Sequence, residues 1–323
     1  MKMRNPWIWF VVAGIAMSVW TSCVVIYDID LLQHLAAWWP ASVTMVFGSF
    51  IAGASAEGGG AVAFPVFTLI LKIPPDAARN FSLMIQSVGM VSASAMIIGL
   101  RIPIEHRAVI IPSIGGIVGM VLGTYTVAPL MEPVPTKLFF VSLWLGFGIG
   151  LWRINRSATR HVRESLPARL ERRDVLILLT TGFIGGIVTS VVGNGIDMLT
   201  FCVLTLWYGL SEKVSTPTSV VLMSVLTVAG TAFHAGVVND IGPKEFNAWI
   251  AAAPVVVFVA PLGAWVASKL RRLHIAYLLQ IIIVAQFVGA LLVLTPSLPH
   301  LAFTAAVSVV STAVMLRIDR TGQ

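Results

Sequence analysis

The chain has 323 residues, of which 57% are hydrophobic and only 11% are charged, and its mean hydropathy is +0.91. A soluble domain of this length would need many more charged residues on its surface, so the composition argues for a membrane protein. The net charge of +7 could suit a nucleic-acid binder, but Lys and Arg lie in short loops between apolar runs, as in membrane proteins. Cys23 and Cys202 both lie in apolar runs, which leaves no disulfide framework and no spacing of metal ligands.

The first apolar run, Trp7–Ile26, follows Lys2 and Arg4 and at first resembles a signal peptide. It has no small-x-small cleavage site, and the residues before Cys23 fit a lipoprotein signal poorly. We therefore predict a retained first transmembrane helix. Residues 27–40 are then predicted to form a polar connection outside the membrane.

Residues 42–71 form the first unusual segment, because they carry one charge, Glu57, which leads directly into Gly58-Gly59-Gly60. Three successive glycines weaken a helix by about 1 kcal/mol each relative to alanine. Irregular backbone at membrane depth survives only where it is buried in protein or lines a cavity. We therefore predict two helical arms of about 14 residues, each reaching about 21 Å, that meet at a glycine tip.

Residues 175–208 repeat this design. They are apolar, are broken at Gly193-Asn194-Gly195, and carry Asp197 as their only charge. Two broken segments at matching places in two halves of a chain indicate the binding site of a transporter.

Further apolar runs predict the remaining transmembrane spans, which a basic loop at residues 153–173 divides into two sets. The predicted spans are residues 80–100, 108–130 and 138–152 before the loop, and 214–238, 246–268, 275–294 and 300–316 after the second broken segment.

The two halves share an ordered series of matches, with an offset that grows slowly from 133 to 140 residues. Phe50-Ile51-x-Gly53 matches Phe183-Ile184-x-Gly186, the two glycine tips match each other, Pro103-x-Glu105 matches Pro243-x-Glu245, Gly123 matches Gly263, and Phe147 matches Phe287. This pattern is typical of a duplicated unit with small insertions. We predict a first helix and outer connection (1–41), repeat 1 (42–152), a basic loop (153–174), repeat 2 (175–294), and a last helix with its tail (295–323).

The distribution of Lys and Arg favours two re-entrant hairpins, each of which enters and leaves the membrane on one side. With both hairpins re-entrant, 17 of the 21 basic residues lie inside and four outside, whereas two full crossings give 11 against 10. The positive-inside rule prefers the first arrangement. The fold expected is an all-α integral membrane protein with eight transmembrane helices and two re-entrant hairpins, in inverted repeats, with both termini cytoplasmic.

Glu57-Gly58-Gly59-Gly60 with Pro65 downstream, the copy Gly193-Asn194-Gly195, and eight spans split by a basic loop resemble the TauE/SafE family of sulfite and organosulfonate exporters. The resemblance covers about residues 43–316. It implies transport of sulfite, sulfonates or related small anions, usually outward, across the bacterial cytoplasmic (inner) membrane. Glu57 departs from the small residue that often precedes the glycines in this family.

An anion site at the two tips also follows from the residues. The second arm of each hairpin starts at the tip, so its free N–H groups and positive dipole end face the membrane centre, and glycine lets an oxyanion approach the backbone. The alternative is that these glycines only permit close helix packing. The predicted substrate-binding residues are Gly58, Gly59, Gly60, Gly193, Asn194 and Gly195, with Asn80, Ser82, Gln86, Thr216, Thr218 and Ser219 as neutral polar groups.

Glu57 and Asp197 are predicted to couple transport to protons. A charged acid at the bilayer centre costs about 2.5–3.5 kcal/mol or more, and burial favours its neutral form. The alternative is that either acid caps backbone N–H groups at the start of a helical arm. His234, near the end of its span, is interpreted as an interfacial or packed residue.

The sequence thus predicts a secondary transporter that exports a small sulfur oxyanion or organosulfonate and needs no cofactor and no metal. The alternatives are a passive anion channel and a permease for another small carboxylate or oxyanion. An intramembrane enzyme would need a nucleophile–base pair or a metal cluster, and no such set stands out in the sequence.

Overall fold

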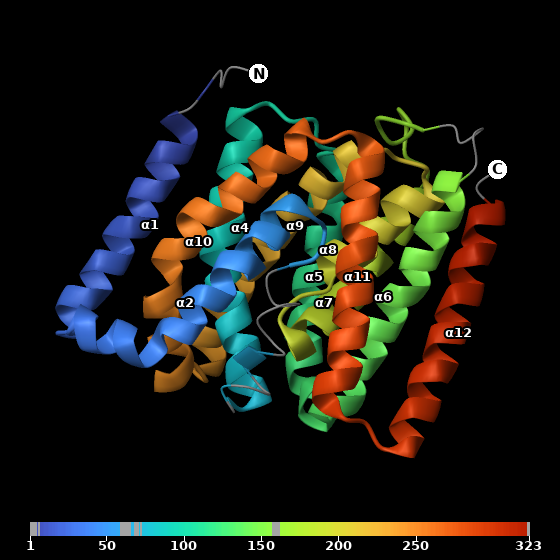
Figure 1. Ribbon diagram of the computed structural model, residues 1–323. Coiled ribbons are helices and arrows are strands. Elements are labelled where there is room, and N and C mark those ends of the chain that lie inside the picture. The colour runs from blue at the N-terminus through green and yellow to red at the C-terminus, as the bar shows by residue number, and fades with distance from the viewer. Residues whose placement is uncertain are drawn as a thin grey trace.

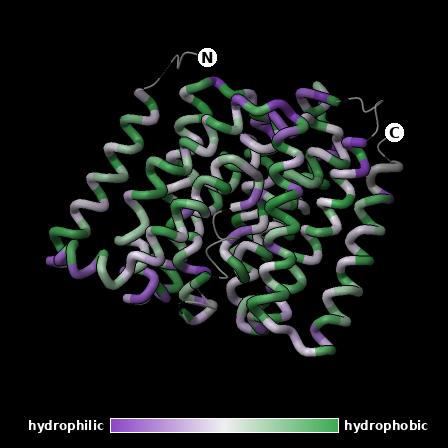
Figure 2. The backbone as a smooth tube through the Cα atoms, viewed as in Figure 1, coloured by the Kyte–Doolittle hydropathy of each residue, from purple (hydrophilic) through white to green (hydrophobic). Residues whose placement is uncertain are grey.

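The computed structural model describes residues 5, 7–58, 66–67, 71, 73–156 and 162–321, and these residues are almost entirely helical. Within these ranges, ten helices are long and apolar enough to span a membrane. Apolar residues run along the helices, and hydrophilic segments gather mostly at the two ends of the bundle (Figures 1 and 2). The prediction of an all-α membrane protein is confirmed, while the division into eight crossings and two hairpins stays a prediction.

The helices follow one another with short connections. In chain order they are α1 (Trp7–Ile26), α2 (Leu31–Ala54), α4 (Pro75–Gly99), α5 (Arg107–Thr126), η2 (Ala128–Leu130), α6 (Pro133–Arg156), α7 (Arg172–Val192), α8 (Ile196–Cys202), η3 (Val203–Trp207), α9 (Glu212–Phe233), η4 (His234–Val238), α10 (Pro243–Lys269), α11 (Arg272–Leu294) and α12 (Leu298–Thr321).

Helix α2 begins earlier than the sequence suggested, so the prediction of a polar connection over residues 27–40 is wrong beyond Asp30. The Asp30 carboxylate caps the helix by accepting the N–H groups of Leu32 and Gln33, at 3.0 and 3.3 Å. Pro40 lies inside α2, and the helix runs along the bottom of Figure 1 before it turns up into the bundle. The first arm is therefore longer than the 14 residues expected.

The second broken segment begins and ends at the same end of the molecule. Arg163 lies in the loop before α7. Its carbonyl accepts a hydrogen bond from the Ser211 N–H at 2.8 Å, and its N–H donates to the Gly209 carbonyl at 2.9 Å. The Tyr208 hydroxyl donates to Asp174, in the first turn of α7, at 3.0 Å. The chain thus returns after η3 to the place where α7 starts. We name this end, where the basic loop lies, the basic end.

The first broken segment starts and finishes at the opposite end. The His34 ring, in the first turn of α2, contacts the carbonyl of Asn247, near the start of α10, at 2.8 Å. Phe67, after the break, stacks on Phe81 near the start of α4, with ring centroids 4.1 Å apart. Both rings share one buried cluster with the first half of α2 and the start of α10. The start of α4 therefore lies at the end of the bundle where α2 begins (Figure 1).

Two helix pairs approach so closely that glycine is required between them. In α2, a β-carbon on Gly53 would collide with the carbonyl of Ala260 on α10. In α5, a β-carbon on Gly119 would collide with the carbonyl of Phe183 on α7. Small residues allow such backbone contact between membrane helices. In the predicted repeats α2 corresponds to α7 and α5 to α10, so each pair joins one helix from each repeat. The repeat itself is not tested by these contacts.

Candidate functional site

The two broken segments meet inside the bundle. A β-carbon built on Gly58 would lie 3.0 Å from Asp197 Oδ2 and 3.2 Å from Asn194 Cβ, and it would collide with Gln86 Oε1. Gly58, Asn194 and Asp197 are all buried. The structure therefore brings together two tips that lie far apart in the sequence. Two further predicted residues, Gly59 and Gly60, lie outside the described residues.

The second tip has a backbone that only glycine adopts readily. Gly193 ends α7 at φ +81°, and Gly195 precedes α8 at φ +147°. The Asp197 side chain then folds back on the turn, because its Oδ1 accepts the N–H groups of Gly195 and Met198 at 3.1 and 3.0 Å. One oxygen of Asp197 thus caps the start of α8. The other, Oδ2, faces Gly58 and has no hydrogen-bond partner among the described residues.

Helix α4 supplies the polar groups that hold the second tip. The side-chain N–H groups of Gln86 donate to the Gly193 carbonyl at 2.9 Å and to Ser82 Oγ at 2.7 Å. The Ser82 hydroxyl also donates to the Gly193 carbonyl, at 3.2 Å. Gln86 Oε1 points at Gly58 and is buried without a partner in the described part of the chain. Ser82 and Gln86 therefore lie at the tips, where the sequence placed them.

Asn80 belongs to a different set of contacts, which we name the Arg79–Asp240 cluster (Arg79, Asn80, His234 and Asp240). The Arg79 guanidinium donates to Asn80 Oδ1 and to Asp240 Oδ2, both at 2.9 Å, and Asn80 donates to the Asp240 carbonyl at 3.0 Å. His234 Nδ1 pairs with Asp240 Oδ1 at 2.8 Å. These contacts engage both ends of its amide, so Asn80 ties α4 to the turn before α10, and its side chain makes no hydrogen bond to the described residues of the tips.

The hydroxyl groups of α9 divide between two roles. Thr218 donates to the Val214 carbonyl at 2.6 Å and accepts the Glu105 N–H at 2.9 Å, so it anchors the connection between α4 and α5. Thr216 and Ser219 are buried, and the hydroxyl groups of both have no partner among the residues that the structure describes. Of the predicted α9 residues, these two retain unused hydrogen-bonding capacity.

Glu57 is fully buried at the end of the first tip, between α6 and α11. Its Oε1 accepts the indole N–H of Trp144, and its Oε2 accepts a side-chain N–H of Gln286. Lys137, seven residues before Trp144 on α6, is also buried and interacts electrostatically with Glu57. The sequence analysis did not predict Trp144, Gln286 or Lys137 as partners of Glu57. Gln286 is a polar residue in the apolar second half of α11, which is itself a signal, and Lys137 lies just before the span predicted at residues 138–152.

The surroundings of Glu57 suit both protonation states. Both carboxyl oxygens accept hydrogen bonds, from Trp144 and from Gln286, and this arrangement suits the ionised form. Gln286 Oε1 is buried with no partner in the described ranges. Amide orientation is an assignment, and rotation of the Gln286 amide would turn Oε1 toward Glu57. A protonated Glu57 would then have an acceptor for its hydroxyl group.

Several buried polar atoms around the tips thus lack partners within the described structure. They are Gln86 Oε1, Asn194 Nδ2, Asp197 Oδ2 and Gln286 Oε1. Such atoms are rare in folded proteins, and each costs about 1–3 kcal/mol when it is left unsatisfied. A polar ligand at the junction of the tips would satisfy the donor, Asn194, directly. No group of three or more His, Cys, Asp or Glu side chains suited to a metal ion occurs in the described ranges.

Comparison with known proteins identifies the family of the chain. No curated protein and no solved structure matches the chain significantly. The family model described as sulfite exporter TauE/SafE matches residues 41–292, which include both tips, the Arg79–Asp240 cluster, and the partners of Glu57. This match covers well over half of the sequence. The chain is a multi-pass membrane transporter that belongs to the sulfite exporter TauE/SafE family.

Proposed function

We propose that the protein is a secondary transporter that binds a small sulfur-containing anion, sulfite or an organosulfonate, at the junction of the two tips and exports it from a bacterial cytoplasm. The observation that carries this proposal is the meeting of Gly58 with Asn194 and Asp197 around buried polar atoms that lack partners. The family supplies the substrate class. No cofactor is required for this function.

The charges near the tips explain how an anion would be tolerated there. Lys137 is the buried cation that interacts with Glu57, and Asn194 Nδ2 is an unused donor. Glu57 and Asp197 are buried acids that repel an anion when they are ionised. Protonation of an acid removes this repulsion, so the anion and the proton favour each other's binding. The predicted role of Glu57 and Asp197 in proton coupling follows from this argument.

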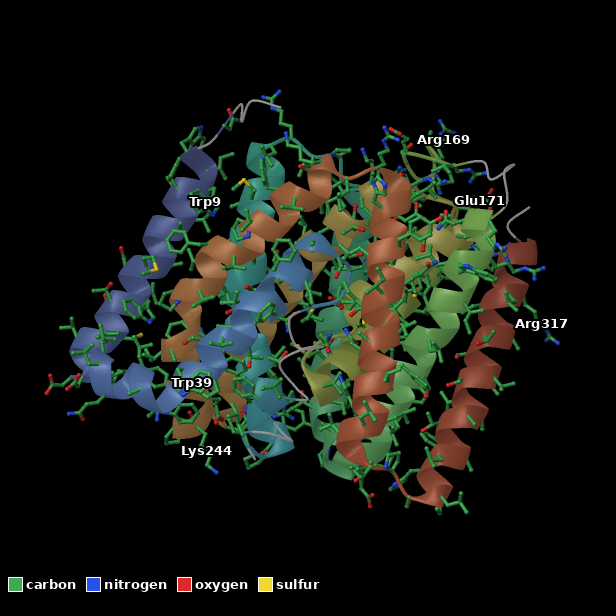
Figure 3. All side chains as sticks on the ribbon, viewed as in Figure 1. Trp9, Trp39, Arg169, Glu171, Lys244 and Arg317 are labelled. Carbon is green, nitrogen blue, oxygen red and sulfur yellow. The ribbon has the colours of Figure 1, made fainter. Side chains whose placement is uncertain are left out.

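We further propose that the basic end faces the cytoplasm, because Lys and Arg are enriched there and membrane proteins keep such residues inside. Arg169 lies at this end and Lys244 at the opposite end (Figure 3). With this orientation α2 and the segment after it enter from the outside, and α7, α8 and η3 enter from the cytoplasm. The result is eight crossings and two re-entrant hairpins in inverted repeats, with both termini cytoplasmic.

The proposal is tested with purified protein reconstituted into liposomes and offered sulfite, sulfoacetate, taurine, sulfate and lactate. We expect saturable flux of at least one sulfur-containing anion, and accumulation when a proton gradient is imposed. Flux that does not saturate and does not respond to the gradient would favour a passive channel. Flux of lactate alone would replace the sulfur anion with a carboxylate.

A further inference from the structure

A cavity of about 170 Å³ opens near the basic end and reaches Gly53, in the last turn of α2 and four residues before Glu57. It lies between the end of α4, the start of α9, the end of α10 and the start of α11. Most of its wall is apolar, with Pro217 and Ile275 among its lining residues, and Lys213, Thr216 and Ser268 supply the polar part.

The polar residues of this cavity are arranged by depth. Lys213, in the first turn of α9, is exposed. Thr216 lies one turn further along α9, is only 2% exposed, and its hydroxyl has no hydrogen-bond partner among the described residues. An anion could therefore first meet the exposed cation at the rim and then, as it loses water, accept a hydrogen bond from the buried hydroxyl deeper in the wall.

The opposite end of the molecule holds the Arg79–Asp240 cluster. There the Arg79–Asp240 cluster joins α4 to the turn before α10 through an ion pair of 2.9 Å, and Arg79 is buried. The Arg79 carbonyl lies close to Gly193, so this cluster sits directly against the second tip. A cavity at the basic end is thus paired with a half-buried ion pair at the other.

We propose that this cavity is the entrance by which the anion reaches the tips from the basic end, with Lys213 attracting the anion at the rim and Thr216 donating a hydrogen bond to it on the way. The inference rests on the proposed function, since it assigns the entry route to the same site. On this proposal the cavity is the part of the route that is accessible from the basic end.

The first test measures uptake of a sulfur-containing anion into inside-out vesicles, in which the basic end faces the buffer. For Lys213→Glu we expect the KM to rise about tenfold at low ionic strength, because charged clefts raise local concentrations of opposite charges by about 10–1,000-fold. The effect should shrink as salt is added, since the Debye length falls to about 8 Å at 0.15 M. The maximal rate should change little.

Arg317→Glu is the matched control, because it makes the same charge reversal on α12, a helix that does not line the cavity. If Arg317→Glu raises the KM as much as Lys213→Glu, the effect is one of overall charge and the entrance is refuted. An unchanged KM for Lys213→Glu refutes it as well.

Thr216 is tested by two substitutions of similar size. Thr216→Val should raise the KM several-fold, whereas Thr216→Ser, which keeps the hydroxyl, should have a KM close to that of the wild type. In a variant without Cys23 and Cys202, Thr216→Cys should react with a charged thiol reagent added at the basic end, and transported anion should slow that reaction. Failure to react from that end overturns the route. If the wild-type protein transports no anion in any vesicle, the proposed function itself has failed, which is a different result from insensitivity to these substitutions.

Discussion

Replacement of Glu57 by Gln is the sharpest test of proton coupling, because the structure suggests that the substitution preserves packing. Gln is close in shape to a protonated Glu. Its oxygen would accept from Trp144 as Glu57 Oε1 does, and its NH₂ group would face Gln286. Rotation of the Gln286 amide would present the unpartnered Oε1 to that group. We therefore expect Glu57→Gln to fold and to resemble the protonated site at every pH.

The size of the expected effect follows from the charge that is removed. Two like charges about 4 Å apart repel by about 4 kcal/mol at an effective dielectric constant of 20. This energy corresponds to roughly a thousandfold in affinity, which is an upper bound because Lys137 offsets part of the repulsion. In the wild-type protein the anion should bind more tightly as pH falls, because protonation of Glu57 removes the repulsion. In Glu57→Gln the affinity should be high and nearly independent of pH.

The measurement is anion binding by calorimetry over about pH 5 to 8, together with transport under a proton gradient. Glu57→Gln should still exchange anion across the membrane but should lose accumulation driven by the gradient. If the wild-type protein and Glu57→Gln have the same pH profile, Glu57 is not the coupling acid. Asp197→Asn then becomes the decisive variant, since Asp197 Oδ2 lies 3.0 Å from a β-carbon built on Gly58.

Three further predictions concern the tips, the orientation and the basic end. Gly58→Ala should weaken transport about fivefold to 150-fold, as expected for about 1–3 kcal/mol of overpacking, whereas Gly14→Ala, which meets nothing within 4 Å, should be neutral in the same flux assay. Single cysteines at Arg169 and Lys213, which bracket the second broken segment, should be labelled from the same side of the membrane by an impermeant thiol reagent, and labelling from opposite sides would refute the re-entrant second segment. Burial opposes ionisation of Glu105, but hydrogen bonds from Arg107 and from the Leu166 N–H outweigh it and lower the pKa of Glu105. The ionised Glu105 should therefore stabilise the fold at neutral pH, and this stabilisation should be lost as pH falls below 4.5 and through the lowered pKa. In thermal unfolding in detergent, Glu105→Gln should be less stable than the wild type at pH 7 and nearly as stable as the wild type in acid.

Local signals in the sequence were sufficient to locate the tips. Runs such as Gly193-Asn194-Gly195 break an apolar helix wherever they occur, and an isolated acid such as Asp197 within an apolar segment stands out. The start of α2 was misplaced because Pro40 suggests a break, whereas the Asp30 cap and packing against α10 keep the helix continuous.

Partners that depend on how distant helices pack could not be found in this way. Trp144 and Gln286 meet Glu57 only because the segment after α2 places Glu57 between α6 and α11, and nothing near them in the sequence indicates that contact. Asn80 was expected at the tips because it lies two residues before Ser82 and six before Gln86 on the same helix. In the structure Asn80 instead bonds to Arg79 and Asp240, so both ends of its amide have partners in the Arg79–Asp240 cluster.

The glycine contacts of α2 with α10 and of α5 with α7 limit how the transporter can move. A slide of one residue along either pair would bring the methyl group of a neighbour such as Ala52 or Ala54 against a carbonyl that only glycine can approach. Each helix pair must therefore move as one rigid body, since close-packed interfaces do not deform continuously. One tip follows the end of α2 and the other follows the end of α7, so each rigid pair carries one tip. Rotation of one pair against the other would therefore open or close the junction of the tips without disturbing the contacts within either pair.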